Sequence, residues 1–269
     1  MAKIPSRSGS VPIRSDHLRG GPGRGELLLV LALWCLLFAW IAPTTSAGAP
    51  RRSNGGTAAG LGREPIGCTS HPGRIVSEGP AAAREVALTF DDGPGATQTP
   101  AILETLNRLG ARATFFEEGR HVVGREALMR EILLNGDEIG NHSFDHPHYP
   151  GLDELASTNR RIREATGFEP CLFRPPYGLV DPRVAEAAVG NHLETILWTF
   201  NAGDDHHVSV ARMQAHVIGW ARPGSIVLMH DGGHHPQTPL ALPRIVEGLR
   251  ERGFRLVTVT ELLGGHFLY

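Results

Sequence analysis

Lysine is almost absent from this chain of 269 residues, which carries it only at Lys3. Schiff-base catalysis and phosphate-binding P-loops both need a lysine, so neither is expected in the body of the protein. An excess of basic residues is also absent, with 26 lysines and arginines against 28 aspartates and glutamates, and no nucleic-acid partner is expected. Histidine, in contrast, occurs 14 times and often close to aspartate. This composition directs attention to metal or acid–base chemistry.

The first 49 residues have the pattern of an export signal. Five basic residues lie within residues 1–25, an apolar run without charge or proline fills residues 27–42, and small residues follow over 43–49. This order is typical of a secretory signal peptide, and an uncleaved signal anchor is the alternative. We therefore expect a secreted, extracellular protein, or one anchored to a membrane by its N-terminus. Residues 50–83 are expected to form a linker and N-terminal extension.

Cysteine is scarce, with three residues in the chain. Cys35 lies in the apolar run, whereas Cys68 and Cys171 lie in the part expected to be exported. In an oxidising compartment Cys68 and Cys171 could form one disulfide, and two separate buried thiols are the alternative.

From about residue 84 onward, short apolar segments alternate with helical patterns. This alternation predicts an α/β protein with a parallel sheet that is closed or nearly closed into a barrel, as a single domain over residues 84–269. The expected strands are 86–90, 113–116, 137–141, 172–174, 195–198, 225–229 and 254–259. The expected helices are 99–109, with Thr99 as N-cap, 122–134, 152–165, 182–189, 208–220 and 240–252.

Polar residues follow five of these strands. They are Asp91-Asp92, the segment from His142 to His146, Arg174 to Tyr177, Asn201 to Asp204, and His230-Asp231. Any one of these segments could be an ordinary polar turn. The active site of a parallel barrel lies at the carboxyl ends of its strands, so five polar segments at these ends together predict one site.

These residues suit metal-assisted hydrolysis. His142 and His146 are four residues apart, which on a helical turn places both imidazoles on one face, and Asp91 or Asp92 offers a third ligand. The other aspartate is then free to act as general base. Ser143 stands where zinc peptidases have glutamate, which excludes that class.

Three further roles complete this hypothesis. His230 is the candidate general acid for a leaving amine, because histidine has a suitable pKa. Arg174 can hold the base carboxylate through a charge-assisted hydrogen bond. Backbone N–H groups near Tyr177 can face a developing oxyanion.

Four motifs in this order resemble the polysaccharide deacetylase family, also known as the NodB-homology domain or carbohydrate esterase family 4. They are Thr89 to Pro94, His142 with His146, Arg174 to Tyr177, and Leu228 to Asp231. The resemblance covers roughly residues 84–264 and implies a distorted (β/α)7-type barrel. It also implies a divalent metal, with Zn²⁺ expected first and Co²⁺ as the alternative.

The resemblance assigns a role to each matching position. It implies Asp91 as the catalytic base, His230 as the general acid, Asp92, His142 and His146 as metal ligands, Tyr177 as the oxyanion N–H donor, Leu228 as the apolar wall for the acetyl methyl group, and Arg174 as the tether of the base. Trp198 and Asp204 also match the family pattern as supporting residues, and Asp204 can orient His230 and raise its pKa.

One motif departs from the family pattern. Asn201 stands where the family usually has an aspartate that supports Arg174, and Asp205 stands where a tryptophan is common. Because asparagine keeps an acceptor but loses the charge, we expect Arg174 to be held less firmly and activity to be reduced or altered. His206 and His207 are expected to be exposed loop residues.

The leading functional hypothesis is an N-deacetylase acting on amino sugars of chitin oligomers or peptidoglycan. The alternatives are an O-acetyl esterase on a xylan-type polysaccharide, a weakly active glycan-binding relative, and a hydrolase of small cyclic amides, which the export signal disfavours. The expected partner is an acetylated polysaccharide or oligosaccharide, with no obligate protein partner. Only 6% of the residues are aromatic, so Tyr149, Tyr177, Trp198 and Phe200 are the chief candidates for stacking on sugars.

Overall fold

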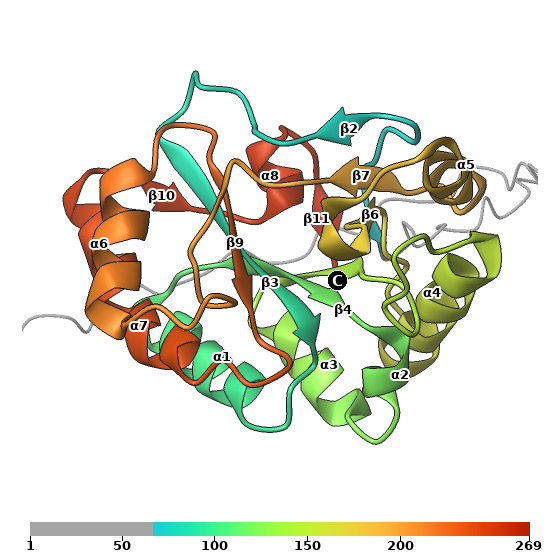
Figure 1. Cartoon of the computed structure of the whole chain (residues 1–269), viewed down its shortest axis with the longest axis horizontal. Coiled ribbons are helices and arrows are strands. Elements are labelled where there is room, and N and C mark those ends of the chain that lie inside the picture. Colours follow the sequence, from blue (N-terminus) through green and yellow to red (C-terminus); the bar gives the residue numbers. More distant parts are fainter. Residues whose placement is uncertain (1–66) are drawn as a thin grey trace, which may run out of the picture. The chain divides into compact units, whose positions relative to one another are not determined.

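A computed structural model describes residues 67–269, and the expected export signal lies outside this range. Its main sheet consists of parallel strands in the order β2-β7-β6-β5-β4-β3-β9-β8, with β10 paired to β3 (Figure 1). The strands are β2 (Ile75–Val76), β3 (Glu85–Gly93), β4 (Ala113–Glu117), β5 (Glu138–Asn141), β6 (Leu172–Phe173), β7 (Glu194–Ile196), β8 (Phe200–Asn201), β9 (Ile226–His230) and β10 (Arg255–Leu256).

One short segment, residues 194–201, joins the two ends of this sheet. Its first part, β7, pairs with β6, and its second part, β8, pairs with β9. The sheet therefore curls round on itself, and the predicted distorted (β/α)7-type barrel is confirmed.

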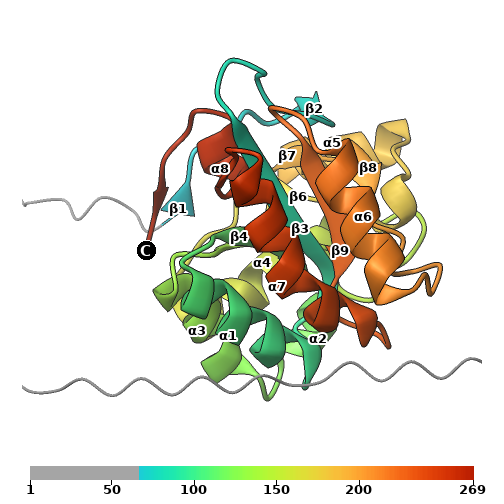
Figure 2. The ribbon, with the colours of Figure 1, turned by 90° about the vertical axis from the view of Figure 1, so that its left-hand side faces the viewer.

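Helices cover the outside of the strands, and α1, α6 and α7 pack beside one another next to β3 and β9 (Figure 2). The helices are α1 (Gln98–Leu109), α2 (Gly119–Val122), α3 (Glu126–Leu134), α4 (Leu152–Thr166), α5 (Pro182–Gly190), α6 (Val210–Trp220), α7 (Gln237–Glu251) and α8 (Val259–Leu262), with a 3₁₀ turn η1 (Pro176–Gly178). No helix within residues 67–269 has the length and apolar character of a membrane span.

Two details of the predicted elements are wrong. Thr97, not Thr99, is the N-cap of α1, because the Thr99 hydroxyl bonds instead to the buried Asp231 side chain. The expected last strand, 254–259, is only the two-residue β10 followed by α8. A capping box at Thr258 and Glu261 starts this helix and turns the chain away from the sheet.

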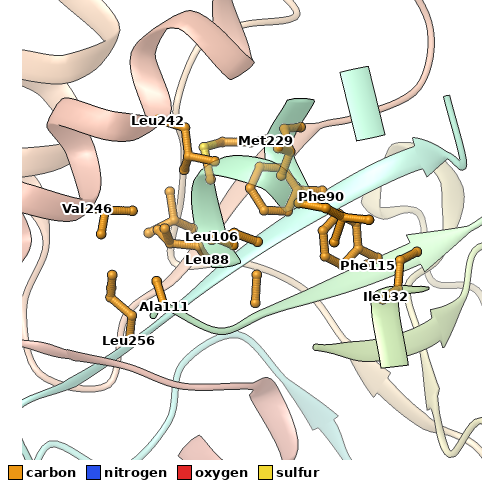
Figure 3. Packing of buried hydrophobic residues seen from close by; sticks show 14 of the residues in the cluster. Leu88, Phe90, Leu106, Ala111, Phe115, Ile132, Met229, Leu242, Val246 and Leu256 are labelled. Carbon is orange, nitrogen blue, oxygen red and sulfur yellow. The ribbon is translucent and has the colours of Figure 1, made fainter. Parts of the chain in front are cut away.

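The alternation of side chains along β3 separates the core from the site. Val86, Leu88 and Phe90 point outward into the largest apolar cluster, where Phe90 stacks on Phe115 of β4 at 5.1 Å between ring centroids (Figure 3). Since successive strand residues face opposite sides, Thr89 and Asp91 point into the barrel. The same strand thus anchors the core and supplies a buried carboxylate.

The ends of the described region meet at a separate small sheet. β1 (Gly67–Cys68) pairs antiparallel with β11 (Phe267–Leu268). Cys68 forms a disulfide with Cys171, just before β6, with Cα atoms 5.8 Å apart. Of the two alternatives for these cysteines, the structure supports the disulfide.

Candidate active site

The register of the sheet brings the predicted strand-end residues together. Asp91, near the end of β3, is the Cα partner of His230 on β9 and of Phe116 on β4. Asp92 follows within β3 at an irregularity in its pairing with β4, with its backbone in the left-handed region at φ 72°. The neighbouring aspartates therefore project from one strand end in different directions.

Arg174 fixes Asp91 from inside the barrel. Its guanidinium donates to Asp91 Oδ1 at 2.8 Å and to Thr89 Oγ1 at 2.7 Å, and it also donates to the backbone carbonyls of Ile196 and Leu197. The Arg174 side chain is fully buried and lies over the Phe116 ring at 4.2 Å. A buried guanidinium with this many acceptors holds one oxygen of Asp91 and leaves Oδ2 facing the site.

Asp92, His142 and His146 form a possible metal site. Asp92 Oδ1 lies 3.3 Å from His142 Nε2 and 3.4 Å from His146 Nε2, and the three ligand atoms are all within 4.8 Å of one another. His142 Nδ1 donates to the carbonyl of Arg174 at 2.7 Å, which turns Nε2 toward Asp92. Two imidazoles and one carboxylate, with room for further ligands, suit a catalytic divalent cation.

The charges of this cluster shift its pKa values. Burial raises the pKa of Asp92, but the hydrogen bond from His142 and the nearby histidine charges outweigh burial, so that the pKa lies below its usual range. Burial lowers the pKa of His146, and the charge of His142 lowers it further. Asp92 is therefore ionised and His146 favours its neutral form. Burial lowers the pKa of His142, but the charges of Asp91 and Asp92 outweigh burial and raise it, so a bound cation would have to displace the proton of His142.

The spacing of the two histidines predicted a helical turn, and this prediction is wrong. They lie in the loop after β5, where Ser143 has φ 64° and His146 has φ 59°. Asn141 accepts a hydrogen bond from the Ser143 N–H, and the Ser143 hydroxyl accepts one from the His146 N–H. These two contacts fold the loop back, so that residues four apart converge without a helix.

His230 is oriented by Asp204. Its Nδ1 lies 3.0 Å from Asp204 Oδ1, and its backbone N–H donates to Asp204 Oδ2 at 2.7 Å. Burial lowers the pKa of His230, but its hydrogen bond to Asp204 and the negative charge of nearby aspartates outweigh burial and raise the pKa to about 9. The imidazole is therefore protonated at neutral pH and can donate a proton from Nε2.

These groups line one cavity of about 390 Å³. It is lined by Asp91, Asp92, His142, His146, Tyr177, Trp198, Asn201, Asp205, Leu228, His230 and His235. Leu228 is buried in its wall, whereas the Tyr177 ring is 56% exposed at its mouth, stacked on His148 at 4.3 Å. Trp198 packs against Gly178, where an added Cβ would come within 2.7 Å of the indole ring.

Asn201 gives Arg174 no support, and other groups hold the guanidinium. Among the described residues, Asn201 makes no hydrogen bond to Arg174, because Thr89 and two backbone carbonyls supply the other acceptors of the guanidinium. The Asn201 side-chain amide instead donates to Asp205 Oδ2 at 2.9 Å. Arg174 therefore has four acceptors without any contribution from position 201, and its weaker hold relative to the family pattern stays a prediction.

Sequence reasoning missed Thr89, His235 and the pocket role of Asp205. Thr89 could have been found from the strand alternation, which places it on the same face as Asp91. His235 follows strand β9 by five residues, and its Nδ1 lies 3.3 Å from the Asp204 carbonyl. No sequence pattern indicates that contact, because it depends on how the loop folds back. His206 and His207 are exposed, as expected.

Comparison with known proteins agrees with this site. The family model described as polysaccharide deacetylase matches residues 78–196. A peptidoglycan-N-acetylglucosamine deacetylase of Bacillus cereus is 37% identical over 199 residues, which cover 71% of this chain and 93% of that protein. A chitooligosaccharide deacetylase of Bradyrhizobium sp. (strain ANU 289) is 31% identical over 201 residues, covering 68% and 92% of the two chains.

A solved structure extends the comparison to the fold. A pseudoenzyme of carbohydrate esterase family 4 from Bacillus anthracis superimposes with a TM-score of 0.66 at 33% identity, covering 72% of this chain and 69% of that chain. The shared fold, the motif residues gathered in one cavity and the identity to curated relatives lead to the same conclusion. The chain belongs to the polysaccharide deacetylase family.

Proposed function

We propose that the protein is a metal-dependent deacetylase that removes N-acetyl groups from the amino sugars of a polysaccharide, peptidoglycan or chitin oligomers. The observation that carries this proposal is the convergence of a tethered carboxylate, a His₂Asp cluster and a protonated histidine in one cavity. The relatives named for peptidoglycan and chitooligosaccharide deacetylation support this choice of substrate class.

The metal would be held by Asp92, His142 and His146. Their donor atoms fit a small divalent cation, and Zn²⁺ is the first choice and Co²⁺ the second, since two imidazoles and a carboxylate suit both. When bound, such a cation supplies Lewis acidity that polarises the acetyl carbonyl and makes water more acidic.

Residues of the chain would carry out the proton transfers and stabilise the oxyanion. Asp91, with Oδ1 held by Arg174, presents Oδ2 as general base to a water molecule. The Tyr177 N–H would stabilise the oxyanion, and Leu228 would form the wall for the acetyl methyl group; both residues line the cavity. His230 then gives its proton to the leaving amine, while Asp204 stabilises the imidazolium before transfer.

A protonated histidine favours an amide over an ester as substrate. An amine leaves only after protonation, and the short contact between Asp204 and His230 keeps that proton available at neutral pH. An O-acetyl ester needs less help from a general acid, so O-deacetylation of a xylan-type polysaccharide is the second reaction to test.

We also propose that the enzyme acts outside the cytoplasm, secreted or anchored by its N-terminus. The proposal rests on the export-signal pattern of residues 1–49. The disulfide between Cys68 and Cys171 supports it, since such bonds persist in oxidising compartments.

The test is acetate release by the purified protein, stripped of metal and then reloaded with Zn²⁺ or Co²⁺. We expect release from chitin oligomers or peptidoglycan only after reloading, and a loss of at least about 10³-fold in His142→Ala. His192→Asn is the matched control, because His192 is exposed and asparagine tolerates its φ of 59°. Release from acetylated xylan alone would reassign the protein to the O-esterases, and metal binding without release from any glycan would contradict an enzymatic function.

A further inference from the structure

Asn201 and Asp205 form one hydrogen-bonded unit in the wall of the active-site cavity. The Asn201 amide uses both of its ends: its oxygen accepts from the Gly203 N–H at 2.7 Å, and its nitrogen donates to Asp205 Oδ2 at 2.9 Å. Because a backbone N–H can only donate, the contact with Gly203 fixes which end of the amide faces Asp205. The carboxylate of Asp205 therefore has a defined orientation.

Asp205 is also fixed through its backbone. Its N–H donates to Asp204 Oδ1 at 3.1 Å, the same oxygen that accepts from His230 Nδ1. A contact to the imidazole of His206 is longer, at 3.8 Å, and that imidazole is 79% exposed. Asp205 thus lies one residue from the group that orients His230, yet its own carboxylate bonds to Asn201 and the residue lines the cavity.

One oxygen of this carboxylate is left for a ligand. Within residues 67–269, Oδ2 is occupied by Asn201, whereas Oδ1 has no protein donor, and the side chain is 34% exposed. A carboxylate only accepts hydrogen bonds, so it selects a donor group. A sugar chain offers two kinds of donor, a hydroxyl group and, on a residue that has already lost its acetyl group, an ammonium group.

We propose that Asp205, oriented by Asn201, is a specificity-determining residue that accepts a hydrogen bond from a hydroxyl or ammonium group of the bound glycan. This inference rests on the proposed function and adds a polar subsite to it. The subsite lies beside His230 and is separate from the residues that carry out proton transfer.

The test compares Asp205→Ala, Asp205→Asn and the Zn²⁺-loaded wild-type protein on fully acetylated and on partly deacetylated chitin oligomers. Loss of a charge-assisted contact in Asp205→Ala should raise KM about tenfold and leave kcat within about twofold. Asn201→Ala should raise KM in the same direction, because it releases the carboxylate. Asp153→Ala is the control, since Asp153 is exposed in the first turn of α4, away from the cavity.

The asparagine variant distinguishes the two donors. If Asp205→Asn keeps most of its affinity for both oligomers, the donor is a hydroxyl group; if it is as weak as Asp205→Ala on the partly deacetylated oligomer alone, the donor is an ammonium group. An unchanged KM in Asp205→Ala on both oligomers, or a fall in kcat alone, would overturn the inference.

Calorimetric titration of the oligomers separates this inference from the proposed function. Wild-type protein that binds but releases no acetate would contradict the proposed function, and the affinity of Asp205→Ala would still decide the role of Asp205. Equal affinity in that variant, or no binding by the wild-type protein, would overturn the inference.

Discussion

The buried carboxylate of Asp204 accepts four hydrogen bonds, one of them from the Asp205 N–H at 3.1 Å. It accepts from the ring and the backbone N–H of His230 and from the Thr238 hydroxyl at 2.7 Å. Burial raises the pKa of Asp204, but the hydrogen bond and the charge of His230 outweigh burial and lower it. The pair therefore exists as carboxylate and imidazolium over the neutral range.

The pH profile of the reaction should report this pair. The pKa of His230 is raised to about 9, so the proton that it must donate is present below that value and lost above it. We expect kcat to fall on the alkaline side near pH 9. Asp204→Asn removes the negative partner, so the alkaline limb should move to lower pH, with kcat at pH 8 reduced about 10²-fold. An unmoved limb would show that another group titrates there.

The positions of some residues of the site could be predicted from the sequence, and those of others could not. Asp91, Asp92 and His230 could be placed, because residues that end parallel strands must meet at one face of a barrel. The partner of Asn201 could not be placed, because it depends on a turn of four residues that brings Asp205 back onto it. Thr89 could have been placed, because the alternation of β3 puts it on the same face as Asp91, with which it shares the guanidinium of Arg174.

The loops that carry the site are held in uncommon backbone conformations. Among residues 67–269, six non-glycine residues have positive φ, and four of them belong to the candidate site: Asp92, Ser143, His146 and Tyr177. Such conformations cost free energy and persist where the surrounding structure enforces them. The helical turn predicted from the histidine spacing is absent for this reason, because the loop brings both imidazoles together without a helix.

The strand β5 begins with a buried glutamate that should make stability depend on pH. Burial raises the pKa of Glu138 to about 7, although Thr260 and Thr114 donate hydrogen bonds that lower it. A carboxyl group whose pKa is higher in the folded state than in the unfolded state favours folding less as the pH rises from about 4.5 to 7. The folded protein should therefore lose stability over this range.

Glu138→Gln should remove that loss. We expect its free energy of unfolding to rise relative to the wild-type protein between pH 5 and 8, by up to about 3 kcal/mol, measured by urea denaturation. Glu247→Gln, at an exposed position on α7, should show no such trend. A difference between Glu138→Gln and wild type that stays constant with pH would contradict this interpretation.

At the scale of the whole molecule, the disulfide links positions 103 residues apart. It ties the strand that starts the described region to the segment before β6. Replacing both Cys68 and Cys171 with serine should lower the free energy of unfolding by about 4 kcal/mol, since the unfolded chain regains the freedom of a long loop. Thermal unfolding with and without reductant measures this. The reductant should lower the midpoint of the wild-type protein to that of the double variant and leave the double variant unchanged.

The barrel as a whole was predictable, but the segment that closes it was not. Alternating strands and helices gave the parallel architecture, because each apolar strand needs a helix to cover it. The seventh expected strand proved to be β10 followed by α8, and the sheet closes instead through residues 194–201. A pattern of apolar residues cannot show that one segment pairs with two neighbours in succession.

The segment that closes the sheet, residues 194–201, also holds Arg174. The carbonyls of Ile196 and Leu197, at the point where it passes from one neighbour to the other, accept hydrogen bonds from Arg174. The hydrogen bonds from Arg174 to Ile196 and Leu197 therefore connect the segment that closes the barrel to the guanidinium that holds Asp91. If this segment opened, Arg174 would lose two of its four acceptors and hold the carboxylate of Asp91 less firmly, so the closure of the sheet also positions a side chain of the candidate site.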